Sequence, residues 1–172
     1  LAAEDGQVTD QLLEYYRERA KGGIGLIITE SNYVRLEGRG GVNRLGFCGK
    51  KHHNGHSRLI QAIHDEGKKI CIQLHHAGRS ASAKGIAQFP VAPTATDTAR
   101  QLDISEIVEI EDAFAEAAAR AKEIGFDALQ IHGAHGYLIN QFLSPLTNHR
   151  TDSYGVDFEG RVRFLLEIVR KV

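Results

Sequence analysis

The sequence has 172 residues, of which 42% are hydrophobic and 25% are charged. This composition is typical of a globular protein and excludes a fibrous or disordered chain. The 21 basic and 22 acidic residues nearly cancel, giving a net charge of −1, so neither nucleic acid nor a membrane is expected as a partner. No apolar run reaches the roughly 18 residues that span a bilayer.

Two further features concern the origin of the chain. Its two cysteines, Cys48 and Cys71, are too few for a disulfide framework, so we expect a cytoplasmic location. Cys71 falls in an apolar stretch and is interpreted as part of the core. The sequence begins at Leu1 and contains no methionine, so we expect the native start to lie outside it.

Helices and strands are expected to alternate along the chain. A helix over 10–21 follows Thr9, which can cap it, and a buried strand over 25–30 comes next. A helix over 52–66 and a strand over 69–75 follow. Asp103 and Glu106 have capping-box spacing before a third helix, which ends at Gly125 and leads into a strand over 126–132. The last helix, over 158–172, is expected to bury Phe158, Val162, Leu165, Ile168 and Val169.

The loops between these elements differ in length at the two ends of the strands. Every connection from a helix to a strand is short and contains glycine, whereas the connections from strand to helix, over 31–51, 76–102 and 133–157, are long. Alternating strands and helices predict a parallel sheet. Long loops with polar residues at one end only predict a site at the carboxyl ends of the strands. This pattern alone fits a barrel or a doubly wound sheet equally well.

Three motifs carry a resemblance to a known family. The first is QIHGAHGYLINQFLSPLTNHRTDSYGVDFEGRVRFLLEIVRKV, over 130–172. The other two precede it in register: GGIGLIITESNYV over 22–34, and KICIQLHHAGR over 69–79 followed by FPVAPTA over 89–95. Together they resemble the old yellow enzyme and NADH:flavin oxidoreductase family, which includes ene-reductases and 2,4-dienoyl-CoA reductases.

The resemblance implies the fold and the chemistry. It implies an α/β fold, the TIM (β/α)₈ barrel, of which residues 1–172 would be a partial FMN-binding domain with about strands 2 to 4. The implied cofactor is FMN, reduced by NADH or NADPH, and the implied partner is a small-molecule alkene. Any iron–sulfur cluster would lie outside this segment. An incomplete barrel has open sheet edges, so the isolated chain is expected to form homo-oligomers or be poorly soluble, and to hold FMN poorly.

The same resemblance assigns site residues. His132 and His135 match the pair that binds the activating carbonyl of the substrate, where two donors stabilise enolate charge. Tyr137 matches the catalytic proton donor, since a phenol is protonated at neutral pH. Gln73 and Ser31 match cofactor-binding positions, and an amide offers both a donor and an acceptor to the flavin edge. No metal ligand is assigned.

Other polar residues receive less specific interpretations. His75, His76 and Arg79 belong to a turn that either lines the site or supports it. A hydrogen-bonded brace is expected in the loop that carries Asn148, Arg150, Asp152 and Tyr154. A solvated helix face is expected for His52, His53 and His56. Val156 stands where the family usually has glycine, which puts the geometry of that loop in doubt.

Two alternatives to a flavin enzyme remain at this stage. Nine histidines, including the pair at 132 and 135, allow a metal-dependent hydrolase on a TIM barrel, although no further ligands stand at a recognisable spacing. The second alternative is a non-catalytic barrel fragment that only folds or assembles. Bound flavin would distinguish a flavin enzyme from both of these alternatives.

Overall fold

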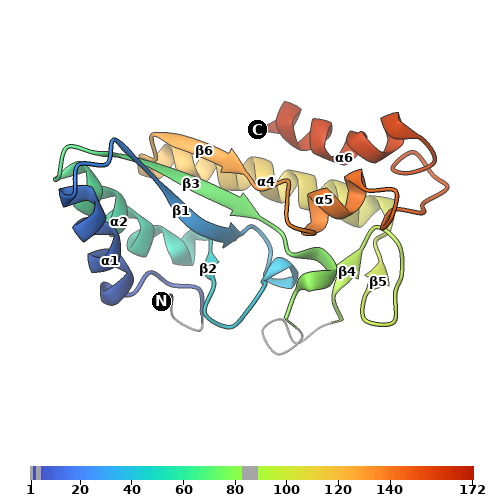
Figure 1. The fold of residues 1–172 in the computed structure, drawn as a ribbon, viewed down its shortest axis with the longest axis horizontal. Coiled ribbons are helices and arrows are strands. Elements are labelled where there is room, and N and C mark those ends of the chain that lie inside the picture. The colour runs from blue at the N-terminus through green and yellow to red at the C-terminus, as the bar shows by residue number, and fades with distance from the viewer. Residues whose placement is uncertain (1, 3–4, 83–88) are drawn as a thin grey trace.

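The computed structural model describes residues 2, 5–82 and 89–172. Helices α1 (Asp10–Lys21), α2 (His53–His64) and α4 (Ile104–Ile124) alternate with strands β1 (Leu26–Tyr33), β3 (Lys69–His75) and β6 (Ala128–Ile131) (Figure 1). Helices α5 (Leu138–Leu143) and α6 (Phe158–Lys171) follow. Short elements fill the long loops: β2 (Leu45–Gly46), β4 (Val91–Ala92), β5 (Arg100–Gln101), and the 3-10 turns η1 (Leu36–Gly38), η2 (Lys50–His52) and η3 (Gly78–Ser80).

The main sheet has the order β2-β1-β3-β6, and all its pairings are parallel. The predicted alternation is therefore confirmed. The predicted capping residues begin two of the helices. Thr9 caps α1 through its side chain, and Asp103 with Glu106 forms the predicted capping box of α4. Gly125 ends α4 with a φ of 99°, a left-handed conformation that costs glycine little.

Two clusters of apolar side chains fill the space between the sheet and its helices. One packs α1 and α2 on the first halves of β1 and β3. The other packs α4, α5 and α6 on the second half of β3. Ile70, Ile72 and Leu74 of β3 are fully buried in these clusters. Figure 1 shows α2 and α4 running along the same side of the strands.

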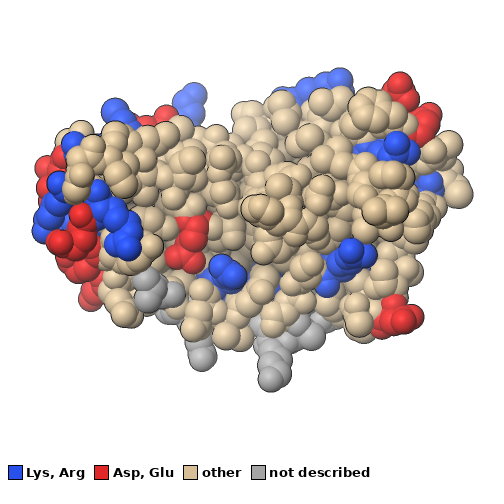
Figure 2. Space-filling model, viewed as in Figure 1, with Lys and Arg blue, Asp and Glu red and all other residues tan. Residues whose placement is uncertain are grey.

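The opposite face of the sheet is open. Leu26 and Ile28 of β1 are 47% and 45% exposed, whereas Ile27 between them is buried. The expectation of a strand buried throughout was therefore wrong, because within the described residues helices cover one face only and side chains alternate between faces. Figure 2 shows charged side chains of both signs gathered around α1, while the area over the strands is largely uncharged.

The prediction for the last helix needs a correction. Phe158 and Val169 are 66% and 54% exposed, while Phe164 and Ile168 are fully buried. The face of α6 that meets α4 and α5 is set by residues 160, 164 and 168, which lie one helical turn apart. Phe164 packs against Phe142 of α5 with ring centroids 4.5 Å apart.

The histidines at the start of α2 also differ from expectation. His52 and His56 are fully buried and do not form a solvated face. Nε2 of His56 lies 2.8 Å from Oδ1 of Asn32, and its Nδ1 lies 2.9 Å from the carbonyl oxygen of His52. Burial lowers the pKa of His56 to about 4, so the ring is neutral near pH 7. A neutral ring has one N–H and donates to one of these two oxygens, and His56 is a core histidine that joins α2 to β1.

Candidate active site

Three polar side chains form a row across the open face of the sheet, towards the carboxyl ends of the strands. The register pairs Ser31 with Gln73 and Gln73 with Gln130. A register shift between Ile28 and Ser31 brings Ser31 level with Gln73. The Nε2 of Gln73 donates to Oε1 of Gln130 at 2.6 Å. The two predicted cofactor-binding residues therefore lie side by side, and Gln130 joins them.

Gln130 was missed by the sequence interpretation. The signal for it was present, because Gln130 lies two residues before His132 and therefore on the same face of an alternating strand. What the sequence did not contain was the register that sets Gln130 opposite Gln73. That register comes from the pairing of β3 with β6.

His132 and His135 face each other just beyond β6. The backbone N–H of His132 donates to the carbonyl of Leu74 at 2.9 Å, which extends the pairing of β6 with β3. The chain then turns back through left-handed conformations at His135 and Gly136, with φ of 57° and 71°. This reversal places Nδ1 of His135 3.3 Å from Nε2 of His132.

The hydrogen bonds of His132 fix where its proton lies. Its Nδ1 accepts from the backbone N–H of Ala134 at 3.2 Å, so the neutral ring carries its hydrogen on Nε2. Burial, helped by the neighbouring His135, lowers the pKa of His132. His132 therefore presents a neutral N–H donor from the end of the strand.

Tyr137 contacts two histidine rings. Its ring centroid is 4.3 Å from that of His75 and 5.0 Å from that of His132, and both contacts are edge-to-face at 82°. Tyr137 is the N-cap residue of α5. The backbone N–H of the next residue, Leu138, donates to the carbonyl of His76 at 3.0 Å. The structure thus gathers His132, His135 and Tyr137 at one place, together with His75.

Gln141 ties this group of loops together. Its buried side chain donates to the carbonyls of Ala77 at 3.2 Å and Gly136 at 2.5 Å, and it accepts from the backbone N–H of Arg79 at 3.2 Å. Gly78 leaves room for this contact, since a Cβ there would come within 2.4 Å of Oε1 of Gln141. Gln141 is a second residue that the sequence interpretation did not single out.

The residues of the turn after β3 have different roles. His75 packs against Tyr137 and belongs to the site. His76 is fully buried and accepts at Nδ1 from the backbone N–H of Gly78 at 3.1 Å, so it supports the turn. The Arg79 side chain is exposed.

A hollow of about 220 Å³ opens at this group of residues. Its walls come from β3, from β6 and from the loop that follows β6: Gln73, Gln130, Ile131, His132, Gly133, Ala134 and His135. The hollow joins the polar row to the histidine pair, so a flat ligand on the row would have its edge close to His132 and His135.

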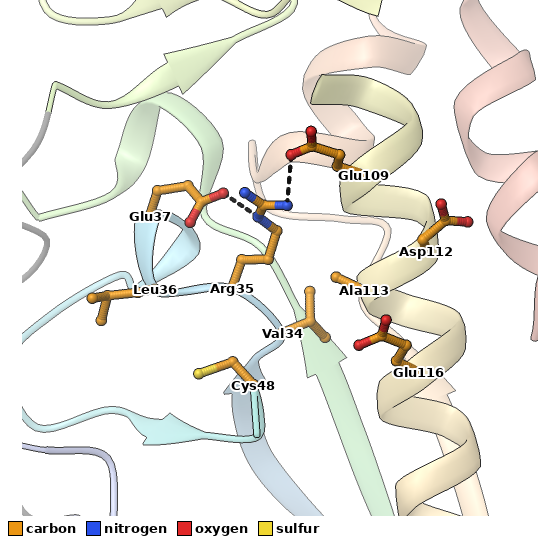
Figure 3. A pocket seen from close by; sticks show the side chains of 9 residues that line it. All are labelled: Val34, Arg35, Leu36, Glu37, Cys48, Glu109, Asp112, Ala113 and Glu116. Carbon is orange, nitrogen blue, oxygen red and sulfur yellow. Dashed lines mark hydrogen bonds and ion pairs between the residues drawn. The ribbon is translucent and has the colours of Figure 1, made fainter. Parts of the chain in front are cut away.

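A larger hollow, of about 470 Å³, lies between the loop after β1 and helix α4 (Figure 3). Arg35 crosses it and pairs with Glu37 and with Glu109, the latter at 3.1 Å. Burial raises the pKa of the Cys48 thiol on its wall, so that thiol is protonated near pH 7. None of the predicted site residues lines this hollow, and its ion pairs are those of a protein surface.

The loop after α5 is the brace that the sequence predicted. Arg150 pairs with Asp152, with Nη2 2.6 Å from Oδ2, and donates from Nη1 to the carbonyls of Pro93 at 2.8 Å and Leu102 at 2.7 Å. Asn148 donates to the carbonyl of Tyr154 at 2.7 Å. Val156 adopts a φ of 52°, so it occupies the left-handed conformation that favours glycine, and the loop holds it there.

Two further features of the described residues bear on other functions. In the described part of the chain, no three His, Cys, Asp or Glu side chains are grouped so as to hold a metal ion. None of the helices that the structure describes is long and apolar enough to cross a membrane.

Comparison with known proteins reveals close relatives. The chain is 46% identical to an NADH oxidase of Thermoanaerobacter brockii, over the whole chain and 28% of that protein. It is 44% identical to an NADPH dehydrogenase of Bacillus subtilis, over 98% of the chain and 51% of that protein. The chain therefore spans at most about half the length of these relatives.

Solved structures agree with the sequence relatives. An old yellow enzyme homologue from Zymomonas mobilis superimposes with a TM-score of 0.94 at 36% identity, over 99% of this chain and 52% of that one. Morphinone reductase superimposes with a TM-score of 0.93 at 34% identity, over 99% of this chain and 51% of that one. The fold is thus about half of a TIM barrel. Residues 1–172 match the model of one family throughout, and the chain belongs to that family, the NADH:flavin oxidoreductase / NADH oxidase family.

Proposed function

We propose that the protein containing this chain is an FMN-dependent oxidoreductase that passes hydride from NADH or NADPH, through the flavin, to an activated alkene. One observation carries the proposal: Tyr137, His132 and His135 converge at the strand ends beside the polar row of Ser31, Gln73 and Gln130. Family membership favours flavin chemistry over the hydrolase alternative.

The residues of the open sheet face fit a flavin. Side-chain amides at Gln73 and Gln130 supply both donors and acceptors, as the polar edge of the ring requires. Ile28 leaves apolar surface exposed on the same face of the sheet, one register pair before them. Ser31 and Gln73 are therefore the residues proposed to hold the ring. Bound FMN would supply the hydride-transfer chemistry, and its phosphate is expected to bind outside this chain, since barrels build that site after their last strands.

The two histidines would act on the substrate oxygen. Reduction of an alkene next to a carbonyl builds negative charge on that oxygen, and preorganised donors stabilise such charge. Nε2–H of His132 already points towards His135 at 3.3 Å, so an oxygen entering between the rings would replace a histidine nitrogen as its acceptor. Once its Nδ1 no longer accepts from His132, His135 would supply the second donor in its Nδ1–H tautomer, from its left-handed turn.

Tyr137 would complete the reaction. Its phenol hydroxyl can donate a proton to the carbon next to the carbonyl. The ring is held by two histidines, one of which is the proposed substrate ligand. The hydroxyl group therefore has a defined position relative to the bound oxygen.

Several broader proposals accompany this function. Residues 1–172 are proposed to be the first part of an FMN-binding barrel domain. Any iron–sulfur cluster would lie outside them, because Cys48 and Cys71 are free and lie in different parts of the fold. The two unpaired cysteines also support a cytoplasmic location. The two open edges of the sheet, at β2 and β6, support homo-oligomer formation by the isolated chain.

The proposal is tested with the full-length protein. After reconstitution with FMN and dialysis, it should be yellow and should reduce an enone such as 2-cyclohexenone with NADH or NADPH, as measured by gas chromatography of the saturated ketone. Residues 1–172 alone, treated in parallel, should be colourless. Full-length protein that binds no flavin, or that oxidises the nicotinamide without reducing any alkene, would contradict the proposed function.

A further inference from the structure

We propose that His75 is a positioning residue whose ring fixes the orientation of Tyr137 for proton donation. The inference rests on the proposed function of Tyr137 and adds a residue to it. His75 belongs to β3, whereas Tyr137 begins α5, so two separate elements would have to be aligned for the phenol to reach the substrate.

Hydrogen bonding does not explain the place of the His75 side chain. The residue is only 3% exposed, and its Nδ1 is buried with no partner in the described part of the chain. Burial, followed by the nearby His76, lowers the pKa of His75 to about 3. The ring is therefore neutral near pH 7, and it contributes neither a charge nor an acid to the site.

Ring contacts do explain the position of the His75 side chain. The His75 centroid lies 4.3 Å from that of Tyr137, at an interplanar angle of 82°, which is the edge-to-face arrangement that aromatic pairs prefer. It lies 5.7 Å from that of His132. The three rings therefore form a compact triangle, in which Tyr137 contacts both His75 and the proposed substrate ligand, His132.

The wall that His75 forms is rigid. Its carbonyl accepts from the backbone N–H of Val34 at 3.1 Å, and its register with Tyr33 continues the sheet. The backbone N–H of Ala77 then donates to the carbonyl of Gly38 at 2.8 Å. The backbone of His75 is therefore fixed within the sheet by its pairing with β1. Without its ring, the phenol of Tyr137 would gain room to swing towards β3.

A pair of substitutions in the full-length, FMN-loaded protein tests the role. His75→Ala removes the wall, and His75→Phe restores a ring without its nitrogens. In stopped-flow reoxidation by 2-cyclohexenone, His75→Ala should be slower by about 10- to 100-fold, the range expected for misplacing a reacting group. His75→Phe should recover most of that loss. The loss should be confined to the alkene half-reaction. Equal loss in both variants, or no loss in either, would overturn the proposal.

A double-mutant cycle separates His75 from Tyr137 itself. Because His75 acts through Tyr137, adding His75→Ala to Tyr137→Phe should cost at most about twofold more, and additive losses would contradict the positioning role. If Tyr137→Phe alone leaves reoxidation unchanged, the proposed role of Tyr137 fails instead.

Nuclear magnetic resonance of tyrosine-labelled protein gives a readout that does not depend on turnover. The Tyr137 ring signals, assigned through Tyr137→Phe, should broaden or average in His75→Ala and return towards the wild-type pattern in His75→Phe. Unchanged Tyr137 signals in His75→Ala would show that His75 does not hold the ring.

Discussion

The two ends of the parallel strands are built differently. At the amino end, Asp127 precedes β6 and accepts from Nε2 of His64 at 2.8 Å, from Nζ of Lys69 at 2.7 Å and from the backbone N–H of Ile70 at 2.9 Å. At the carboxyl end, the polar row and the histidine pair bond mainly to one another, and His75 leaves a nitrogen without a partner among the described residues.

This contrast separates stability from function. A carboxylate that accepts from three protein donors has used most of its roughly four acceptor sites, so it has little capacity left to bind a ligand. Side chains whose donors and acceptors are only partly used keep that capacity, at a cost in folding energy. Polar groups at the carboxyl ends of barrel strands are where catalysis is expected, and those at the amino ends serve stability.

His132→Ala should have the largest effect on ligand binding at the carboxyl end. Phenols place a negatively charged oxygen where the substrate oxygen would lie, so removal of the Nε2–H donor should weaken their binding by about 1.5–3 kcal/mol. That is a loss of about 10- to 100-fold in affinity. Titration of the FMN-loaded full-length protein with a phenol measures it.

His149→Ala is the matched control for this titration, because the His149 side chain is exposed and lies outside the hollow at the strand ends. It should leave phenol affinity unchanged. Equal affinity for His132→Ala and the wild type would remove His132 from the binding site.

Asp127→Asn should have a smaller effect, and of the opposite kind. The substitution removes the charge from three hydrogen bonds and should lower the free energy of unfolding by about 1–2 kcal/mol, with both half-reactions unchanged. Chemical denaturation measures the stability. Asp112→Asn is the control, since Asp112 is exposed and its side chain pairs with Lys171, and exposed pairs of this kind contribute little. A slowed half-reaction in Asp127→Asn would break the distinction between the two ends.

The pH dependence of stability sharpens the same comparison. Burial disfavours the charged form of Asp127, but the bonds from Lys69, His64 and Ile70 outweigh it and lower its pKa far below the ordinary value. A lowered folded-state pKa contributes stability above the unfolded pKa of about 4, and this contribution is lost as the pH falls below that value. The wild type should therefore lose more stability than Asp127→Asn between about pH 4 and pH 2.

Much of the fold could be predicted because its signals are local. Caps at Thr9 and Asp103, the glycine stop at Gly125 and apolar periodicity define the elements within a few residues. What could not be predicted depends on distant pairing. The burial of His56 on α2 requires Asn32 from strand β1, and the exposure of Leu26 and Ile28 requires knowing that one sheet face is open.

The site divides in the same way. The resemblance nominated Ser31, Gln73, His132, His135 and Tyr137, and the structure brings them to one end of the sheet. The sequence assigned no specific role to Gln130 or His75, because the contacts of each side chain depend on a neighbour that is far away in the sequence. Their contacts appear only once β3 is paired with β6 and α5 is packed beside both.

The most direct test of the central claim is a stopped-flow comparison of Tyr137→Phe with the wild type in the full-length, FMN-loaded protein. Tyr15→Phe, at a partly exposed ring on α1, is the control. Flavin reduction by the nicotinamide should stay nearly the same in all three proteins. Reoxidation by 2-cyclohexenone should slow in Tyr137→Phe alone, by about 100-fold or more, as expected for loss of a general acid. Equal slowing of both half-reactions, or unchanged reoxidation, would contradict the assignment of proton donation to the carboxyl end of the strands.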